Sequence, residues 1–160
     1  EDGKDQSVGF QRRSTLEDLL READIISIHT PLTDETNSLI NEQTISSMKK
    51  DAILITTARG KVVDLDAITA ALKSNRIAAA ALDVLPEEPP DPEHALFTAL
   101  KSGEEWTIGR VIVTPHAAWY SPDGAYDARE KAAQTIINFL TKGILRNCVN
   151  QQFLQSDGAE

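Results

Sequence analysis

The feature that most constrains the fold is the alternation of short apolar runs with segments of helical periodicity. Four runs have the length and composition of buried strands, at residues 24–29, 52–57, 77–84 and 110–114. Helical segments alternate with them, at about residues 15–22, 41–49, 64–72, 96–100 and 122–143. Strands that are apolar on both faces and alternate with helices predict an α/β fold with a parallel sheet covered on both sides. Four strands are few for a doubly wound sheet, so a partial one is predicted.

Local signals support three of these helices. Ser14 and Glu17 have the spacing of a capping box, in which each side chain bonds to the backbone amide of the other residue. Asp64 is placed to cap the third helix, and Pro122 follows Ser121, the expected N-cap of the last one. Their starts are therefore predicted on grounds independent of their apolar stripes. A glycine at position 143 is expected to end the last helix.

Length, charge and cysteine content limit the classes of protein to consider. A chain of 160 residues forms one domain or a piece of a larger one. Its net charge of −9 argues against binding to nucleic acid or to anionic lipid. Cys148 has no partner within the chain, which excludes a secreted scaffold built on disulfides, and no apolar run reaches the roughly 18 residues of a membrane span. Because the chain begins at Glu1 without a leader, we expect a fragment whose upstream part is missing.

The residues that follow the four runs carry most of the chemistry. In an open parallel sheet, ligands bind at the carboxyl ends of the strands, where loops and helix N-termini meet. The second run is followed by Arg59, the third by Asp83 and Glu88, and the fourth by His116. A cation, a carboxylate and an imidazole are therefore predicted around one small pocket at one edge of the sheet. An arginine can hold a substrate carboxylate in a bidentate fork, and a histidine beside a carboxylate can move a proton near neutral pH.

Each of these residues also has an ordinary structural interpretation. Taken alone, Arg59 would be a surface ion-pair residue, Glu88 a solvated loop carboxylate and His116 a loop cap. Their order after successive strands favours function over these alternatives. His29 and His94 are predicted to be structural or solvated, and no metal site is predicted because the histidines and the cysteine lack ligand spacing. The Gly-x-Ser-x-Gly elbow of a serine hydrolase does not occur in the sequence.

Three successive segments resemble the signatures of the D-isomer-specific 2-hydroxyacid dehydrogenases. They are Ile53-Leu54-Ile55-Thr56-Thr57-Ala58-Arg59-Gly60, then Ala80-Ala81-Leu82-Asp83-Val84 with Glu87-Glu88-Pro89, then Thr114-Pro115-His116. The resemblance implies that the sheet is the later half of a Rossmann NAD-binding domain, followed by a helix that crosses to a substrate domain. Two further segments are similar to the C-terminal-binding-protein branch of transcriptional corepressors: His116-Ala117-Ala118-Trp119-Tyr120-Ser121 and Asn147-Cys148-Val149-Asn150.

The resemblance also implies roles for individual residues. Arg59 would bind the carboxylate of a 2-keto acid. His116, paired with Glu88 rather than with its neighbour Glu87, would be the acid in reduction and the base in oxidation. NAD is the implied cofactor, with Asp83 at its carboxamide. The implied cofactor-binding residues are Thr30, Pro31, Thr36, Thr57, Ala58, Arg59, Asp83, His116, Ala117, Ala118 and Trp119.

The implied organisation has three parts. Residues 1–127 would belong to the NAD-binding domain, 128–153 to a crossover helix and the return to the substrate domain, and 154–160 to a tail. The family's Gly-rich phosphate loop and the acidic residue that reads the adenosine ribose have no match in the chain. Leu85-Pro86 departs from the corepressor branch, and the Glu104–Trp106 stretch has no counterpart. The chain alone is predicted to be inactive, because half a sheet leaves an unpaired edge and exposed apolar faces.

The predicted function is reversible hydride transfer between NAD and a small 2-keto or 2-hydroxy acid. The alternative is an NAD-binding corepressor with little catalysis. A homodimer is expected from the resemblance, with no direct binding of nucleic acid or membrane. The expected compartment is the cytoplasm or the nucleus, and not the secreted space. The particular acid, and the choice between NAD and NADP, stay open at the level of sequence.

Overall fold

Residues 9, 11–146 and 148–150 are described by the structure, which is a computed structural model. The chain divides into two units, residues 1–118 and 119–160, and each is considered by itself. The predicted tail at 154–160 lies outside the described residues, and so does Asn147 of the second corepressor-like segment.

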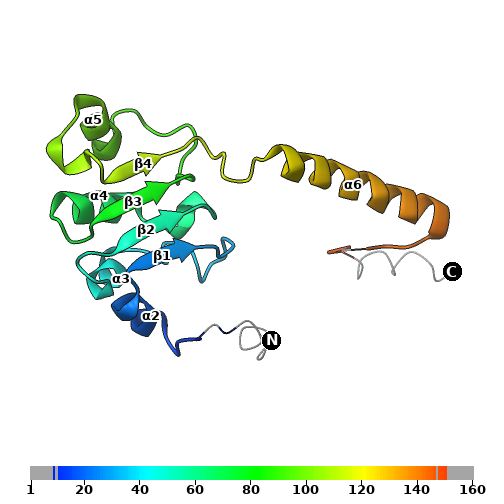
Figure 1. Ribbon diagram of the computed structural model, residues 1–160, viewed down its shortest axis with the longest axis horizontal. Helices are drawn as coiled ribbons and strands as arrows, with labels where there is room; N and C mark the ends of the chain where they lie inside the picture. The colour runs from blue at the N-terminus through cyan, green and yellow to red at the C-terminus, as the bar shows by residue number, and fades with distance from the viewer. Residues whose placement is uncertain (1–8, 10, 147, 151–160) are drawn as a thin grey trace. The chain divides into compact units, whose positions relative to one another are not determined.

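Four parallel strands form the sheet of the first unit: β1 (Ile25–Ile28), β2 (Ile53–Thr56), β3 (Ala79–Leu82) and β4 (Val111–Val113). They are hydrogen-bonded in that order (Figure 1). In the register, Thr56 lies beside both Ile28 and Leu82, and Leu82 lies beside Val113. The strands therefore end together, and the residues that follow them share one edge. The α/β class and the parallel sheet predicted from the apolar runs are confirmed.

Helices and 3₁₀ turns precede and connect these strands. They are α2 (Leu16–Glu22), α3 (Glu42–Ser47), η1 (Gly60–Val62), α4 (Leu65–Lys73), α5 (Ala95–Ser102) and η2 (Glu105–Thr107). Asp64 caps α4 as predicted, since its carboxylate accepts the amide of Ala67. At α2 the predicted cap is displaced by one residue: Thr15, not Ser14, is extended and accepts the amide of Asp18. An N-cap side chain reaches the amide three residues further on, so the first helical residue decides which hydroxyl caps.

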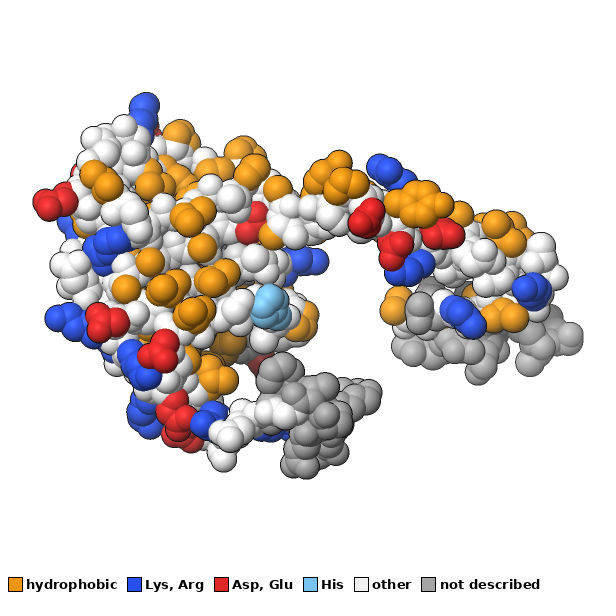
Figure 2. All heavy atoms as spheres, viewed as in Figure 1, with side chains coloured by type: hydrophobic (Ala, Val, Ile, Leu, Met, Phe, Trp, Pro, Cys, Tyr) orange, Lys and Arg blue, Asp and Glu red, His pale blue; other side chains and the backbone are white. Residues whose placement is uncertain are grey.

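The helices share a core with one face of the sheet. Alternate strand residues pack in one cluster with side chains of all four helices; its members include Ile26, Ile28, Leu54, Ala80, Leu82, Leu20, Ile45, Ile68 and Leu96. The other face keeps Ile25, Ile53 and Ile112 exposed, and Figure 2 shows hydrophobic side chains gathered over the strands. Within the first unit, the helices thus cover one face of the sheet, where the sequence predicted that both faces are covered. Each strand is added on the same side of the previous one, so right-handed crossovers place every connecting helix on one face.

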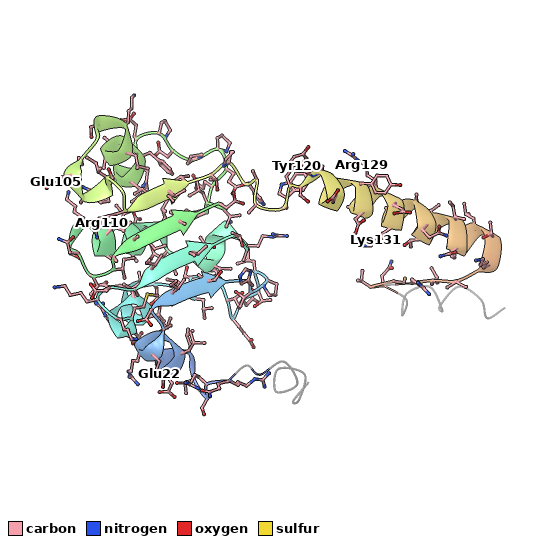
Figure 3. All side chains as sticks on the ribbon, viewed as in Figure 1. Glu22, Glu105, Arg110, Tyr120, Arg129 and Lys131 are labelled. Carbon is pink, nitrogen blue, oxygen red and sulfur yellow. The ribbon has the colours of Figure 1, made fainter. Side chains whose placement is uncertain are left out.

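The amino end of the sheet is held by Arg110, which directly precedes β4 (Figure 3). Its guanidinium donates to the carbonyl oxygens of Ala78 at 2.7 Å and Ile77 at 2.8 Å, and to Asn75 Oδ1 at 2.8 Å. It also donates to the carbonyl of Trp106 in η2. The 104–106 stretch, which has no counterpart in the family that the sequence resembles, therefore forms part of a turn packed against this end.

The second unit contains the long helix α6 (Pro122–Lys142). Ser121 caps its first turn and Gly143 ends it in a left-handed conformation at φ +64°, as predicted. No residue of α6 is buried, and Ile136, Ile137 and Leu140 of its apolar stripe are exposed. The predicted boundary between residues 127 and 128 falls inside this helix, and its crossing to a substrate domain stays a prediction. Within the described part of the chain, none of the helices is long and apolar enough to cross a membrane.

Candidate active site

Side chains from three loops meet at the carboxyl edge of the sheet. Asp83 follows β3 directly, and the loop that begins there reaches Glu88. The loop after β4 reaches His116, and Arg59 lies between β2 and η1. The structure thus places the predicted cation, carboxylate and imidazole at one edge, as expected from parallel strands that end together. It brings two of the three into direct contact.

Glu88 and His116 form a hydrogen-bonded pair. His116 Nδ1 lies 2.8 Å from Glu88 Oε2, and the other carboxylate oxygen accepts the amide of Leu85 at 2.9 Å. The side chains are 43% and 39% exposed for His116 and Glu88. The hydrogen bonds from His116 and from the Leu85 amide favour the carboxylate and hold the pKa of Glu88 below its ordinary value. Glu88 is therefore ionised at neutral pH and fixes the orientation of the imidazole.

Asp83 connects the end of β3 to the loop that carries His116. Its carboxylate accepts the hydroxyl of Thr114, the amide of Ala117 at 2.9 Å and the amide of Ala118 at 3.0 Å. Asp83 is only 6% exposed. Burial acts to raise its pKa, but these three hydrogen bonds outweigh burial, and the pKa lies below the ordinary value. Asp83 is thus an ionised, buried carboxylate whose partners all belong to the neighbouring loop.

Arg59 is exposed and lies just before η1. Among the described residues, its one side-chain hydrogen bond runs from Nη1 to the carbonyl oxygen of Ala58, at 2.7 Å. The next residue, Gly60, is pressed against the loop after β3: a Cβ built on it would lie 1.8 Å from the carbonyl oxygen of Leu85. Only glycine allows this approach. Because the Leu85 amide holds Glu88, the approach connects the arginine loop to the carboxylate.

The three side chains lie on an open edge of the first unit. Arg59, Glu88 and His116 are all exposed. A pocket of about 380 Å³ lies next to them, and its walls include Lys61 and Glu87, but none of the three lines it. The three side chains therefore lie on an exposed edge beside this pocket. The small pocket expected around all three stays a prediction.

The predicted cofactor-binding residues of the first unit lie along the same edge. Thr30 follows β1, and its Oγ1 is buried without a hydrogen-bond partner among the described residues, so that a bound molecule could supply one. Thr36 donates to the carbonyl oxygen of Pro31 at 2.6 Å and closes the loop. Thr57 and Ala58 continue from β2, with Thr57 exposed. These uncharged hydroxyl and backbone groups fit a polar, extended cofactor such as NAD.

Trp119 is the predicted cofactor-binding residue that belongs to the second unit. It packs edge-on against Tyr120, with 5.5 Å between the ring centroids, and it is 68% exposed. Its closure over the nicotinamide stays a prediction. Ala117 and Ala118, predicted beside it, take part in the first unit through their amides, which donate to Asp83.

The other two histidines have structural partners. His94 caps α5, because its Nδ1 accepts the amide of Leu96, and its Nε2 lies 3.0 Å from Asp66. His29 Nε2 lies 2.8 Å from the hydroxyl of Ser27. In the portion of the chain that the structure describes, no group of three or more His, Cys, Asp or Glu side chains is placed to hold a metal ion.

Two groups at the site were not predicted: the hydroxyl of Thr114, which binds Asp83, and the amide of Leu85, which binds Glu88. Thr114 is the last residue of the fourth apolar run, and this was a signal that could have been used, because a hydroxyl at the end of a parallel strand lies near the ligand-binding edge. The Leu85 amide left no such signal, because every residue except proline has one.

Comparisons with known proteins agree with this geometry. The family described as D-isomer specific 2-hydroxyacid dehydrogenase, NAD binding domain, matches residues 1–118. The chain is 44% identical over 151 residues to a protein of Aeropyrum pernix named glyoxylate reductase, covering 94% of this chain and 42% of that protein. It is 39% identical over 137 residues to a putative 2-hydroxyacid dehydrogenase of Haemophilus influenzae, covering 86% of this chain and 42% of that one.

Two solved structures give the same result. D-mandelate dehydrogenase of Rhodotorula graminis aligns with a TM-score of 0.74 and 29% identity, covering 89% of this chain and 39% of that one. The NAD complex of a D-isomer specific 2-hydroxyacid dehydrogenase from Lactobacillus delbrueckii ssp. bulgaricus aligns with a TM-score of 0.70 and 34% identity, covering 84% and 42%. The finer resemblance to the corepressor branch stays a prediction. The chain spans about two-fifths of the length of the relatives it matches, and it belongs to the D-isomer-specific 2-hydroxyacid dehydrogenases, with residues 1–118 matching their NAD-binding domain.

Proposed function

We propose that the protein carrying this chain is an NAD-dependent 2-hydroxyacid dehydrogenase that reduces a small 2-keto acid reversibly. The observation that carries the proposal is the 2.8 Å contact between Glu88 and His116 at the carboxyl edge of the sheet. The names of the relatives support the same class of reaction, since one is a glyoxylate reductase and the other a putative 2-hydroxyacid dehydrogenase.

His116 would move the proton. Because Glu88 faces Nδ1, the neutral ring carries its hydrogen there, and Nε2 is the atom that can exchange a proton with substrate. In reduction, the protonated ring would give the Nε2 proton to the carbonyl oxygen as the alcohol forms. In oxidation, Nε2 would take the hydroxyl proton back. The ionised Glu88 stabilises the protonated ring between these steps.

Arg59 would hold and orient the acid. Its guanidinium is exposed, and its one side-chain hydrogen bond within the described residues goes to the carbonyl of Ala58, which steadies the side chain beside the strand end. The remaining N–H donors match a carboxylate in a bidentate fork. A 2-keto acid held in this way also places its carbonyl next to a positive charge, which stabilises the negative charge that develops on the oxygen during reduction.

NAD, when bound, supplies the hydride that C2 of the keto acid receives. The residues proposed to hold it are Thr30, Pro31, Thr36, Thr57, Ala58, Arg59, Asp83, His116, Ala117, Ala118 and Trp119. Thr30 is included because it follows β1 at the carboxyl edge of the sheet. Asp83 is proposed to lie at the carboxamide, and its carboxylate also accepts three hydrogen bonds from its own chain.

The substrate and the assembly are also proposals. The name of the Aeropyrum pernix relative favours a short acid such as glyoxylate, and a homodimer is expected from the family. We also expect the 160-residue chain to be inactive by itself. Its exposed Ile25, Ile53 and Ile112 form an uncovered sheet face, which favours association over independent folding.

The test is NADH oxidation by the complete gene product with glyoxylate, pyruvate and hydroxypyruvate. Acetaldehyde, which is pyruvate without its carboxylate, serves as the matched control substrate. We expect turnover with at least one keto acid, far slower turnover with acetaldehyde, and loss of turnover in His116→Gln. No turnover with any of the three acids, together with NADH-dependent self-association, would contradict the proposal and favour the corepressor alternative.

A further inference from the structure

The loop that carries His116 is hydrogen-bonded to the side chain of a single residue, Asp83. Asp83 Oδ1 accepts the Thr114 hydroxyl and the Ala117 amide, and Oδ2 accepts the Ala118 amide. The backbone carbonyl of Asp83 also accepts the amide of His116, at 2.9 Å. Every residue from 114 to 118 except the proline is therefore hydrogen-bonded to Asp83.

The backbone conformation of His116 depends on these hydrogen bonds. Its φ is +54°, in the left-handed region that residues with a Cβ seldom adopt. A residue keeps such a conformation only where the surrounding structure enforces it. Here the enforcement comes from bonds on both sides of His116: Thr114 precedes it, and Ala117 and Ala118 follow it. Without them, the loop is free to relax to an ordinary conformation, and the imidazole turns away from Glu88.

We propose that Asp83 is a positioning residue, whose buried carboxylate holds the 114–118 loop in the conformation that presents His116 to Glu88. Its expected effect on reaction rate rests on the proposed function, whereas its effect on the loop rests on the contacts alone. Asp83 thus acts through His116, in addition to any contact with the cofactor.

Burial and charge support this role over a contact with a bound molecule alone. Asp83 is 6% exposed, and its carboxylate already accepts three hydrogen bonds. All three partners are donors, so the site requires a group that only accepts. An asparagine has the same shape but presents an NH₂ group in place of one oxygen. It would therefore face at least one of these donors with another donor.

Variants of the complete gene product separate positioning of the 114–118 loop from contact with the cofactor. Thr114→Val removes one hydroxyl with little change of shape, and Thr114→Ser keeps that hydroxyl as the matched control. Thr114 is bonded to Asp83 but is not among the residues proposed to hold the cofactor. Asp83→Asn changes the acceptor itself. Two quantities are measured: kcat and KM for NADH, and hydrogen–deuterium exchange at the amides of Ala117 and Ala118, with thermal unfolding as the check on folding.

If Asp83 positions the loop, Thr114→Val lowers kcat about tenfold with an almost unchanged KM for NADH, because one bond to a charged acceptor is lost. Thr114→Ser restores kcat. In Asp83→Asn, kcat falls further, and the two amides exchange at least about tenfold faster than in the wild type.

The result that overturns the proposal is a raised KM for NADH in Asp83→Asn while Thr114→Val matches the wild type in kcat and in exchange. If the wild type reduces no 2-keto acid, the proposed function fails, but the exchange measurement still decides. Unchanged exchange at both amides in Asp83→Asn and Thr114→Val then rejects the positioning role. If Asp83→Asn does not fold, the Thr114 pair decides alone.

Discussion

Arg110 and Arg59 stand at opposite ends of one parallel sheet, and each end uses its guanidinium differently. Arg110 precedes β4, is partly buried and donates to the carbonyls of Ala78, Ile77 and Trp106 and to the side chain of Asn75. Arg59, beyond β2, is exposed and donates to its neighbour Ala58. A guanidinium whose donors are used within the chain stabilises the fold, whereas one with donors facing solvent can bind an anion.

The carboxylates at the carboxyl end show a second part of this contrast. Asp83 is buried and bonded to its own loop, while Glu88 is half exposed and bonded to His116. The carboxyl edge therefore contains a buried, hydrogen-bonded carboxylate and an exposed Glu88–His116 pair, which is the pair that we propose to be catalytic. Substitutions at the amino end should change stability and leave chemistry intact, and substitutions of the outer groups at the carboxyl end should do the reverse.

The largest effect is expected for His116→Gln. Glutamine cannot pass a proton at neutral pH, so kcat for keto acid reduction should fall by about 10²–10⁴-fold, the usual contribution of general acid–base catalysis. The thermal unfolding midpoint should stay close to that of the wild type, because His116 is an exposed side chain. A variant that keeps most of its activity would remove His116 from the mechanism.

The second-largest effect is expected for Arg59→Lys, because lysine keeps the positive charge but cannot donate two parallel hydrogen bonds to one carboxylate. Without the second parallel hydrogen bond to the substrate carboxylate, kcat/KM for the keto acid should drop by about 10–100-fold. The free energy of unfolding should change by less than about 0.5 kcal/mol, as for an ordinary surface substitution. Steady-state kinetics and urea unfolding of the same preparation measure both quantities.

Arg110→Lys is the matched variant at the other end, and the expected pattern is inverted. A lysine cannot reach the carbonyls of Ala78 and Ile77 and the side chain of Asn75 together, so the variant should lose about 1–3 kcal/mol of unfolding free energy. The KM for the keto acid should not change. Equal stability of the Arg59 and Arg110 variants would show that the two ends do not differ as described.

The smallest predicted effect is a change in the free energy of unfolding at low pH. The pKa values of Asp83 and Glu88 lie below their ordinary values in the folded protein. A carboxyl with a lowered pKa stabilises the fold at pH values above its ordinary pKa, and this stabilisation is lost as the pH falls through the lowered pKa. The stability gap between wild type and Asp83→Asn should therefore be full at pH 6 and shrink at pH 3. If the difference in unfolding free energy between the wild type and Asp83→Asn does not depend on pH, Asp83 does not stabilise the fold through its charge.

The positions of Arg59, Asp83, Glu88 and His116 at one edge could be predicted from sequence alone. Parallel strands that are paired in register end together, so the residue types that follow successive apolar runs meet without knowledge of any side-chain contact. The strands themselves were predictable because buried runs of Ile, Val, Leu and Ala alternated with helical stripes. The N-cap at Asp64 was predictable because an N-cap depends on the residue type directly before a helix.

What could not be predicted depends on distances across the fold. Glu88 is held by the Leu85 amide, and Gly60 makes room for the Leu85 carbonyl, but neither backbone contact depends on a recognisable residue type. The sheet face that the helices of the first unit leave uncovered was missed because Ile25 and Ile112 look like buried residues in any local window, although each is 62% exposed. Their environment is set by which elements pack on that face, and the direction of the crossovers decides this.

The central claim is that Glu88 and His116 act as one unit at this edge, and a double-mutant cycle on the complete gene product tests it most directly. Glu88→Gln, His116→Gln and the double variant are compared with the wild type by their single-turnover rates of keto acid reduction. The account predicts that Glu88→Gln alone slows the reaction about tenfold. It also predicts that the double variant is no slower than His116→Gln, since the carboxylate acts through the imidazole. Multiplication of the two single effects would contradict it, because Glu88 would then act independently of His116.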